Sequence, residues 1–110
     1  MEADHAVKAL GALAQDHRLA AFRLLVAAGP NGLPAGALAE RLAVPASSMS
    51  FHLAQLSHAG LVIQRRQGRS IIYSADFPAM TGLIAYLTDN CCAGASCEIP
   101  AVPASALCQG

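Results

Sequence analysis

Apolar side chains recur every three or four positions through the first half of the chain, the spacing of helices that bury one face. We expect Asp4 to cap the first helix and Asp16 to cap the second, because Asp accepts hydrogen bonds from the free N–H groups of a first turn. Gly29 stops the second helix, and Pro30-Asn31-Gly32 forms a turn. The two apolar stripes are Val7, Leu10 and Leu13, and then Leu19, Phe22, Leu25 and Val26.

Two shorter helices are predicted next, over residues 35–43 and 46–59. Pro45 suits the start of the second of these, because its fixed φ is helical and its missing N–H is not needed there. Gly60 ends that helix. Its apolar stripe is Met49, Leu53 and Leu56.

The pattern then changes to two β-prone runs, residues 61–63 and 70–73. The segment Arg65-Arg66-Gln67-Gly68-Arg69 between them contains a glycine and is typical of a hairpin turn. Pro78 opens a last helix, and Asn90 and Gly94 bracket its end. The apolar side of that helix carries Met80, Leu83, Ile84 and Leu87. The predicted fold class is mainly α with a β-hairpin wing, a winged helix-turn-helix.

The composition fits one packed domain. Of the 110 residues, 55% are hydrophobic and 13% charged, which is far from the composition of a disordered chain. The apolar runs are too short to cross a bilayer, and Glu2, Asp4 and His5 stand where a signal peptide would be basic. We therefore expect a cytoplasmic protein without a membrane partner, in surroundings that disfavour structural disulfides.

Basic charge is concentrated in one third of the chain, although the net charge is zero. Residues 41–75 contain four arginines and no acidic residue, which is compatible with binding a polyanion. In a helix-turn-helix the second helix enters the DNA major groove by its N-terminal half, and a basic hairpin can reach phosphates or the minor groove. The candidate DNA-binding residues are Ser47, Ser48, Ser50, His52, Gln55, Arg65, Arg66 and Arg69.

Each of these residues also has a simpler interpretation. Serines are common at helix starts, and four arginines can form an ordinary solvated face. A winged helix can also contact another protein without DNA. The order of helix, turn, helix and basic hairpin is what favours duplex DNA as the partner.

Two neighbouring segments carry a resemblance to a known family. They are Ser50-Phe51-His52-Leu53-Ala54-Gln55-Leu56-Ser57-His58-Ala59-Gly60-Leu61-Val62 and Arg65-Arg66-Gln67-Gly68-Arg69, with Tyr73 after them. Together they resemble the ArsR/SmtB family of bacterial metal- and metalloid-responsive repressors. The resemblance covers residues 5–92. It implies a homodimer on a palindromic duplex operator, joined through the first and last helices. The interface residues that it implies are Val7, Leu10, Leu83, Ile84 and Leu87.

Phe51 departs from this family, which often has Arg at that position. An apolar group there would either touch a thymine methyl or be partly buried, and the sequence leaves both open. Residues 1–92 are assigned to the DNA-binding and dimerisation domain. Residues 93–110 are assigned to a flexible, thiol-bearing tail.

All four cysteines, Cys91, Cys92, Cys97 and Cys108, lie after residue 90. The first three form Cys-Cys-Ala-Gly-Ala-Ser-Cys, whose small residues let Cys97 return to the adjacent pair. Three thiolates make a soft site that suits pyramidal As(III) or Sb(III), whereas Zn(II) prefers four ligands. Cys108 would complete a four-thiolate site only if the tail folded back, which costs about 1–2 kcal/mol per ordered residue.

Similar Cys-Cys clusters close the last helix in some arsenic-responsive members of the family, and the resemblance implies the same role here. The predicted function is a repressor, not an enzyme, that needs no cofactor and is released by As(III) or Sb(III) at Cys91, Cys92 and Cys97. Methylated trivalent arsenic, which needs only two thiols, is a further candidate ligand. A soft divalent ion such as Cd, Pb or Zn, or a thiol redox switch, remains the alternative. Neither Cys-x-x-Cys nor Cys-x5-Arg, the motifs expected of thiol enzymes, is present.

Overall fold

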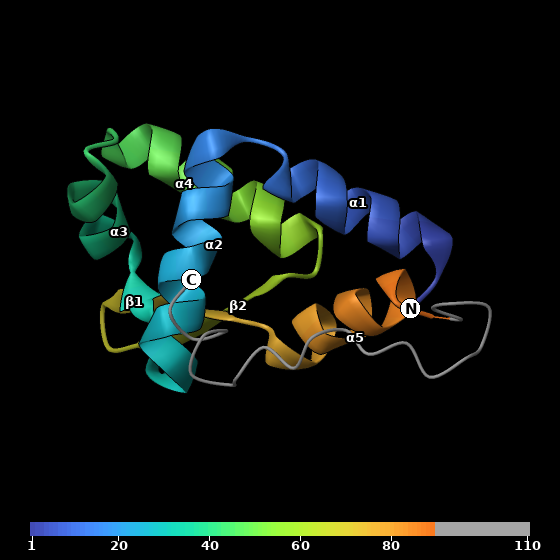
Figure 1. Ribbon diagram of the computed structural model, residues 1–110. Coiled ribbons are helices and arrows are strands. Elements are labelled where there is room, and N and C mark those ends of the chain that lie inside the picture. The colour runs from blue at the N-terminus through green and yellow to red at the C-terminus, as the bar shows by residue number, and fades with distance from the viewer. Residues whose placement is uncertain (90–110) are drawn as a thin grey trace.

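Five α-helices and a three-stranded antiparallel sheet are formed by residues 1–89, the part of the chain that the computed structural model describes (Figure 1). The helices are α1 (Ala3–Leu13), α2 (Asp16–Ala28), α3 (Ala35–Leu42), α4 (Ala46–His58) and α5 (Phe77–Leu87). A 3-10 turn, η1 (Gly29–Asn31), and the strands β1 (Leu33–Pro34), β2 (Val62–Gln67) and β3 (Ser70–Ala75) complete the chain order. The predicted winged helix-turn-helix is confirmed. Asn90, Gly94 and the predicted tail lie outside the described residues.

The predicted caps of the first two helices are wrong. Helix α1 begins before Asp4, which lies in its first turn, and its N-cap makes no side-chain hydrogen bond. In α2 the cap is Gln15, whose Oε1 accepts a hydrogen bond from the backbone N–H of Arg18 at 2.9 Å. Asp16 is the first helical residue instead, where its negative charge still favours the positive end of the helix dipole.

The central helix of the fold is α4, whose apolar stripe is completely buried. Met49, Leu53 and Leu56 all have 0% exposure, as the spacing predicts. In α2 the buried positions are shifted from the predicted stripe, because Leu19 is 44% exposed and Ala21 lies in the core instead.

The wing is a β2–β3 hairpin, and the predicted hairpin is confirmed, with Val62 opposite Ala75 and Gln67 opposite Ser70. Its predicted turn is wrong in length, because β2 continues through Arg65, Arg66 and Gln67 and leaves only Gly68 and Arg69 between the strands. Strand β1 pairs antiparallel with the other edge of β3, placing Leu33 opposite Tyr73. No sequence pattern predicts β1, because two residues are too few for an alternation to be recognised. Through β1 the wing is joined to the segment between α2 and α3.

Gly32→Ala is expected to destabilise the protein strongly. Gly32 has a φ of +69°, and a Cβ there would overlap the backbone carbonyl oxygen of Tyr73 in β3. The matched control is Gly29→Ala, because Gly29 has a φ of +76° with no atom within 4 Å of the added Cβ. Both glycines have ψ near 180° (−165° and −169°), a region of positive φ that is essentially restricted to glycine. Gly29→Ala should therefore cost about 1–3 kcal/mol of backbone strain, and Gly32→Ala clearly more. Urea denaturation measures both free energies of unfolding, and equal losses would contradict the close contact.

Candidate nucleic-acid interface

Helices α3 and α4 form the helix-turn-helix at one end of the molecule (Figure 1). Ala43 ends α3 in the left-handed region with a φ of 53°, and Val44 donates its backbone N–H to the carbonyl of Ala39 at 3.0 Å. Val44 is only 7% exposed, so it anchors the turn in the core. Pro45 then occupies the N-cap of α4. The turn therefore fixes the direction in which α4 leaves α3.

The N-terminal half of α4 presents small polar residues on the side away from the core. Ser47 and Ser50 are exposed, and Ser48 is half-buried. Phe51 lies one helical turn after Ser47 and is 57% exposed. We call this side the outer face of α4, and it is the part of the predicted reading helix that is open to a ligand. It consists of Ser47, Ser50, Phe51 and Ala54.

The two other candidates on α4, His52 and Gln55, lie on a different side of the helix. The ring of His52 packs against His17 of α2, with ring centroids 5.6 Å apart, and His52 Nδ1 is buried without a hydrogen-bond partner among the described residues. Gln55 faces a hollow between α1, α2 and α4. The predicted reading set is thus divided between two sides of α4.

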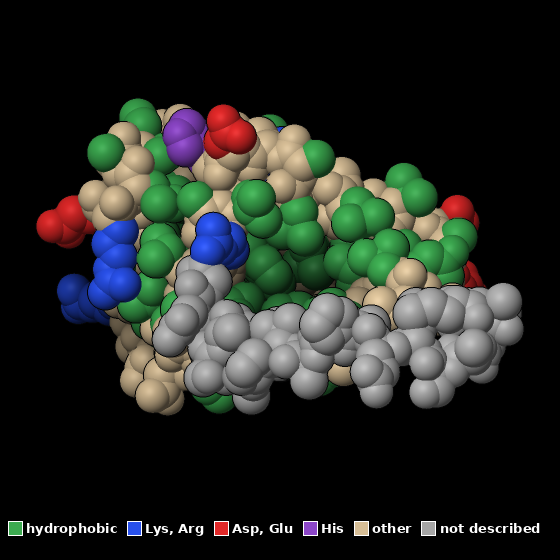
Figure 2. All heavy atoms as spheres, viewed as in Figure 1, with side chains coloured by type: hydrophobic (Ala, Val, Ile, Leu, Met, Phe, Trp, Pro, Cys, Tyr) green, Lys and Arg blue, Asp and Glu red, His purple; other side chains and the backbone are tan. Residues whose placement is uncertain are grey.

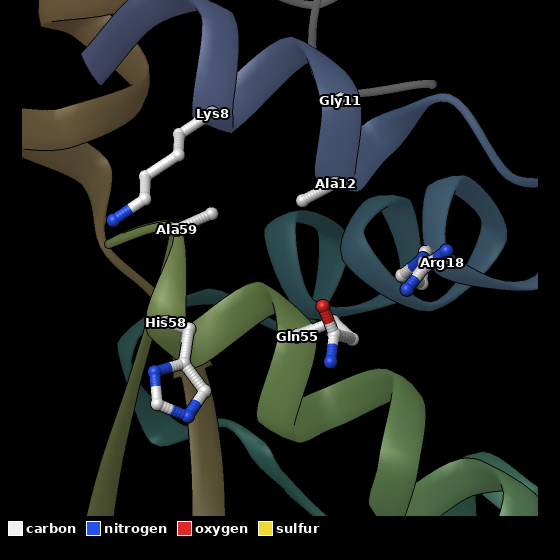
Figure 3. Close-up of a pocket in the computed structure, with 7 residues that line it drawn as sticks. All are labelled: Lys8, Gly11, Ala12, Arg18, Gln55, His58 and Ala59. Carbon is white, nitrogen blue, oxygen red and sulfur yellow. The ribbon is translucent and has the colours of Figure 1, made fainter. Parts of the chain in front are cut away.

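This hollow has a volume of about 270 Å³ and is shown in Figure 3. No carboxylate lines it, and Arg18 Nε is buried without a hydrogen-bond partner among residues 1–89. In Figure 3, Lys8 extends from α1 toward the end of α4, where His58 lies. The lining residues are Lys8, Gly11, Ala12, Arg18, Gln55, His58 and Ala59. The hollow joins residues about fifty positions apart, so no local motif could reveal it.

The three wing arginines are all exposed but have different surroundings. Arg65 donates hydrogen bonds to the backbone carbonyls of Pro30 at 3.2 Å and Asn31 at 3.1 Å. Arg66 is next to it in β2 and points to the other face of the hairpin. Arg69 lies in the turn beside Gly68, which has a φ of +63°. Arg66 and Arg69 are therefore the better placed of the three to reach a phosphate.

Burial lowers the pKa of His52 below its ordinary value, and the positive charges of Arg18 and His17 lower it further. Because the unfolded chain then binds more protons than the folded one, stability falls as the pH drops below about 6.5. In His52→Gln, the free energy of unfolding should fall less between about pH 7.5 and pH 5.5 than in the parent. Urea denaturation at both pH values measures this. Gln55→Ala, the control on the same side of α4, should keep the parent's dependence, and an unchanged dependence in His52→Gln would contradict the prediction.

Helices α1 and α5 lie side by side at the other end of the molecule (Figure 1). Both carry exposed apolar side chains, and those over α1 are visible in Figure 2. On α1, Val7 is 69% and Leu10 is 42% exposed, and on α5, Ile84 is 54% and Leu87 is 56% exposed. Leu83, the fifth predicted interface residue, is only 6% exposed and packs in the core of its own chain. It therefore has little surface left to offer a partner.

The predicted metalloid ligands Cys91, Cys92 and Cys97 lie outside the described residues, as does Cys108. Within residues 1–89, no group of three or more His, Cys, Asp or Glu side chains is arranged to hold a metal ion. In the same part of the chain, no helix is long and apolar enough to cross a membrane.

A sequence family described as a helix-turn-helix domain matches residues 13–65, from the end of α1 into β2. No match was found among curated proteins. Among solved structures, HlyU from Vibrio cholerae N16961 is 34% identical with a TM-score of 0.62, over 79% of this chain and 97% of that one. A possible transcriptional regulator for arsenical resistance is 29% identical with a TM-score of 0.64, over 73% and 80% of the two chains.

A third similar structure is the homodimeric winged helix-turn-helix DNA-binding domain of a possible ArsR-family transcriptional regulator from Mycobacterium bovis. It is 27% identical with a TM-score of 0.61, over 79% of this chain and 81% of that one. The chain belongs to the ArsR family. The resemblance carried by residues 50–62 and 65–69 is thereby confirmed. As an ArsR-family member the chain is a transcriptional regulator, in a family of DNA-binding proteins rather than enzymes.

Proposed function

We propose that this protein is a homodimeric repressor that binds a palindromic duplex operator and releases it when As(III) or Sb(III) binds Cys91, Cys92 and Cys97. The observation that carries the sensing part is the position of the thiols. Cys91 follows Leu87, the last residue of α5, by four positions. A ligand held by these thiols would act at the end of a helix that we assign to the dimer interface.

Operator binding is supported by the charge and exposure of the two DNA-facing elements. The outer face of α4 carries hydroxyl groups, which can approach phosphates or base edges. Arg66 and Arg69 are exposed on the wing, and no acidic residue occurs in residues 41–75 to oppose a polyanion. In this geometry the helix would enter the major groove and the wing would lie over the adjacent backbone.

Dimerisation is supported by the apolar side chains that α1 and α5 leave exposed. Val7, Leu10, Ile84 and Leu87 would lose contact with water in a two-fold interface, which is favourable in proportion to the apolar area removed. The dimer also doubles the contacts with DNA and sets the reading helices about 34 Å apart, one turn of the duplex. The similar domain from Mycobacterium bovis is itself homodimeric.

Release by arsenite or antimonite is supported by the softness and number of the thiols. Three thiolates match the three bonds of a pyramidal As(III) or Sb(III) ion, and methylated trivalent arsenic would use two of them. Binding would rearrange the end of α5 and with it the spacing of the two reading helices. A coupling of about 1–3 kcal/mol, usual for allostery, would lower the operator affinity by roughly 5–150-fold.

The test begins with the full chain under strong reductant. Sedimentation equilibrium should give twice the chain mass of 11.3 kDa, and selection from a random duplex pool should return a palindrome. Fluorescence anisotropy of that duplex is then followed during titration with arsenite, antimonite, methylarsenite, Cd(II) and Zn(II). Release by the trivalent species at the lowest concentrations is expected. Release only by Cd(II) or Zn(II), or only on oxidation, would replace the metalloid with a divalent ion or a redox signal.

A further inference from the structure

Phe51 is the largest side chain on the outer face of α4, and 57% of it is exposed. Its neighbours on that face are small, since Ser47 and Ala54 lie one turn before and after it and Ser50 lies beside it. The ring therefore stands above the surrounding helix surface. The sequence leaves partial burial open as an explanation of this ring, but contacts within the chain leave more than half of it uncovered.

The orientation of the Phe51 ring is supported from one side by other rings. Its centroid lies 5.9 Å from that of His52, with an angle of 62° between the ring planes, which is the edge-to-face arrangement that aromatic pairs favour. His52 packs in turn against His17 of α2. A row of three rings thus links the outer face of α4 to α2. An aromatic side chain has few rotatable bonds, so ordering it on a ligand costs little entropy.

Neither the core nor the dimer face accounts for this exposed ring. The core side of α4 is filled by Met49, Leu53 and Leu56, and the exposed apolar residues of α1 and α5 lie at the other end of the molecule. The surroundings of Phe51 are hydroxyl-bearing and lie in the third of the chain that lacks acidic residues. Such a surface fits duplex DNA, which has charged phosphates on the outside and an apolar group on some base edges inside the major groove.

In the major groove the only apolar group on a base edge is the C5-methyl group of thymine, and a phenyl ring can neither donate nor accept the hydrogen bonds of the other edges. We propose that Phe51 reads sequence by packing against the C5-methyl group of one thymine in each half-site. Ser47 and Ser50 beside it then position the helix on the phosphates. The proposal rests on duplex binding by α4 and is independent of the ligand that the thiols bind.

The experiment uses the duplex selected by the parent protein from a random pool. Each thymine is replaced in turn by deoxyuridine, which removes the methyl group and keeps the base pairing. At one thymine position in each half-site, this replacement should lower the affinity of the parent about fourfold, which is the loss expected when one methyl group is no longer buried. Phe51→Ala should lose affinity for the thymine duplex and show no further loss with deoxyuridine at that position.

Two other variants separate this effect from general damage. Leu19→Ala removes an exposed apolar side chain from α2, so it should keep the parent's sensitivity to deoxyuridine. Phe51→Arg should select guanine in place of that thymine, because Arg pairs with the acceptors of guanine. Equal sensitivity of Phe51→Ala and the parent to every deoxyuridine would overturn the proposal. Failure of the parent to select any duplex would instead overturn DNA binding itself.

Discussion

Each of the changes Cys91→Ser, Cys92→Ser and Cys97→Ser is expected to leave operator binding intact and to abolish or strongly blunt release by arsenite. The three thiols lie within seven residues, so closing a three-coordinate ring needs little chain ordering. Serine keeps the size of the side chain and removes the soft sulfur donor that As(III) requires. The measurement is fluorescence anisotropy of the operator complex during arsenite titration under strong reductant.

Cys108→Ser is the matched control, because Cys108 follows Cys97 only after ten intervening residues, with Pro100 and Pro103 among them. It should respond like the parent, and so should a chain truncated after Ile99. If Cys108→Ser alone removes the response, a four-thiolate site for a divalent ion becomes the better explanation. If no cysteine change matters, the inducing ligand is not one that binds thiols.

Arg66→Ala and Arg69→Ala are expected to weaken operator binding and to make its salt dependence shallower. Each lost phosphate contact should reduce the slope of log affinity against log salt by about 0.9, counted over both protomers. Arg65→Ala is the matched control from the same wing. Its guanidinium already donates to the carbonyls of Pro30 and Asn31. Arg65→Ala should therefore lower the free energy of unfolding, and it should change the salt slope less than the Arg66→Ala, Arg69→Ala double variant does.

Anisotropy titrations at several salt concentrations measure the slopes, and urea denaturation measures the stabilities. A slope in the Arg66→Ala, Arg69→Ala double variant equal to that of the parent would place the wing outside the DNA interface. A larger change of slope in Arg65→Ala than in the double variant would show that Arg65 leaves its backbone partners when DNA binds.

Elements fixed by repeated local patterns could be predicted closely from the sequence. The helix expected over residues 46–59 is observed as Ala46–His58, because its apolar spacing and its flanking Pro45 and Gly60 all favour the same limits. Features that depend on a single contact with a distant part of the chain could not be predicted from the sequence. Strand β1 exists only because Leu33 and Pro34 meet the edge of β3, some forty residues later in the chain.

The candidate site shows the same division. The positions of Ser47 and Ser50 on the outer face follow from the helix itself. Helical geometry also turns His52 about 100° away from Phe51, so its separation from the outer face could be predicted from the sequence. Gln55 lies four residues after Phe51, about 40° around the helix, so its place in the hollow depends on α1 and α2. The hydrogen bonds of Arg65 could not be predicted from the sequence, since the carbonyls that accept them lie thirty-four and thirty-five residues earlier in the chain.

Hydrogen bonds join the wing to the elements around it. Gln64 of β2 donates to Ser57 Oγ of α4 at 3.3 Å, Arg65 joins β2 to η1, and Asp76 donates its backbone N–H to the carbonyl of Leu61 at 2.8 Å. Motion of the wing relative to α4 would have to break these hydrogen bonds. In the proposed dimer, the placement of one protomer relative to its two-fold mate can change without breaking any of them. Under the proposed function, an inducer bound at the end of α5 would act by changing the distance or angle between the two protomers, and the wing and α4 of each protomer would then shift together on the DNA.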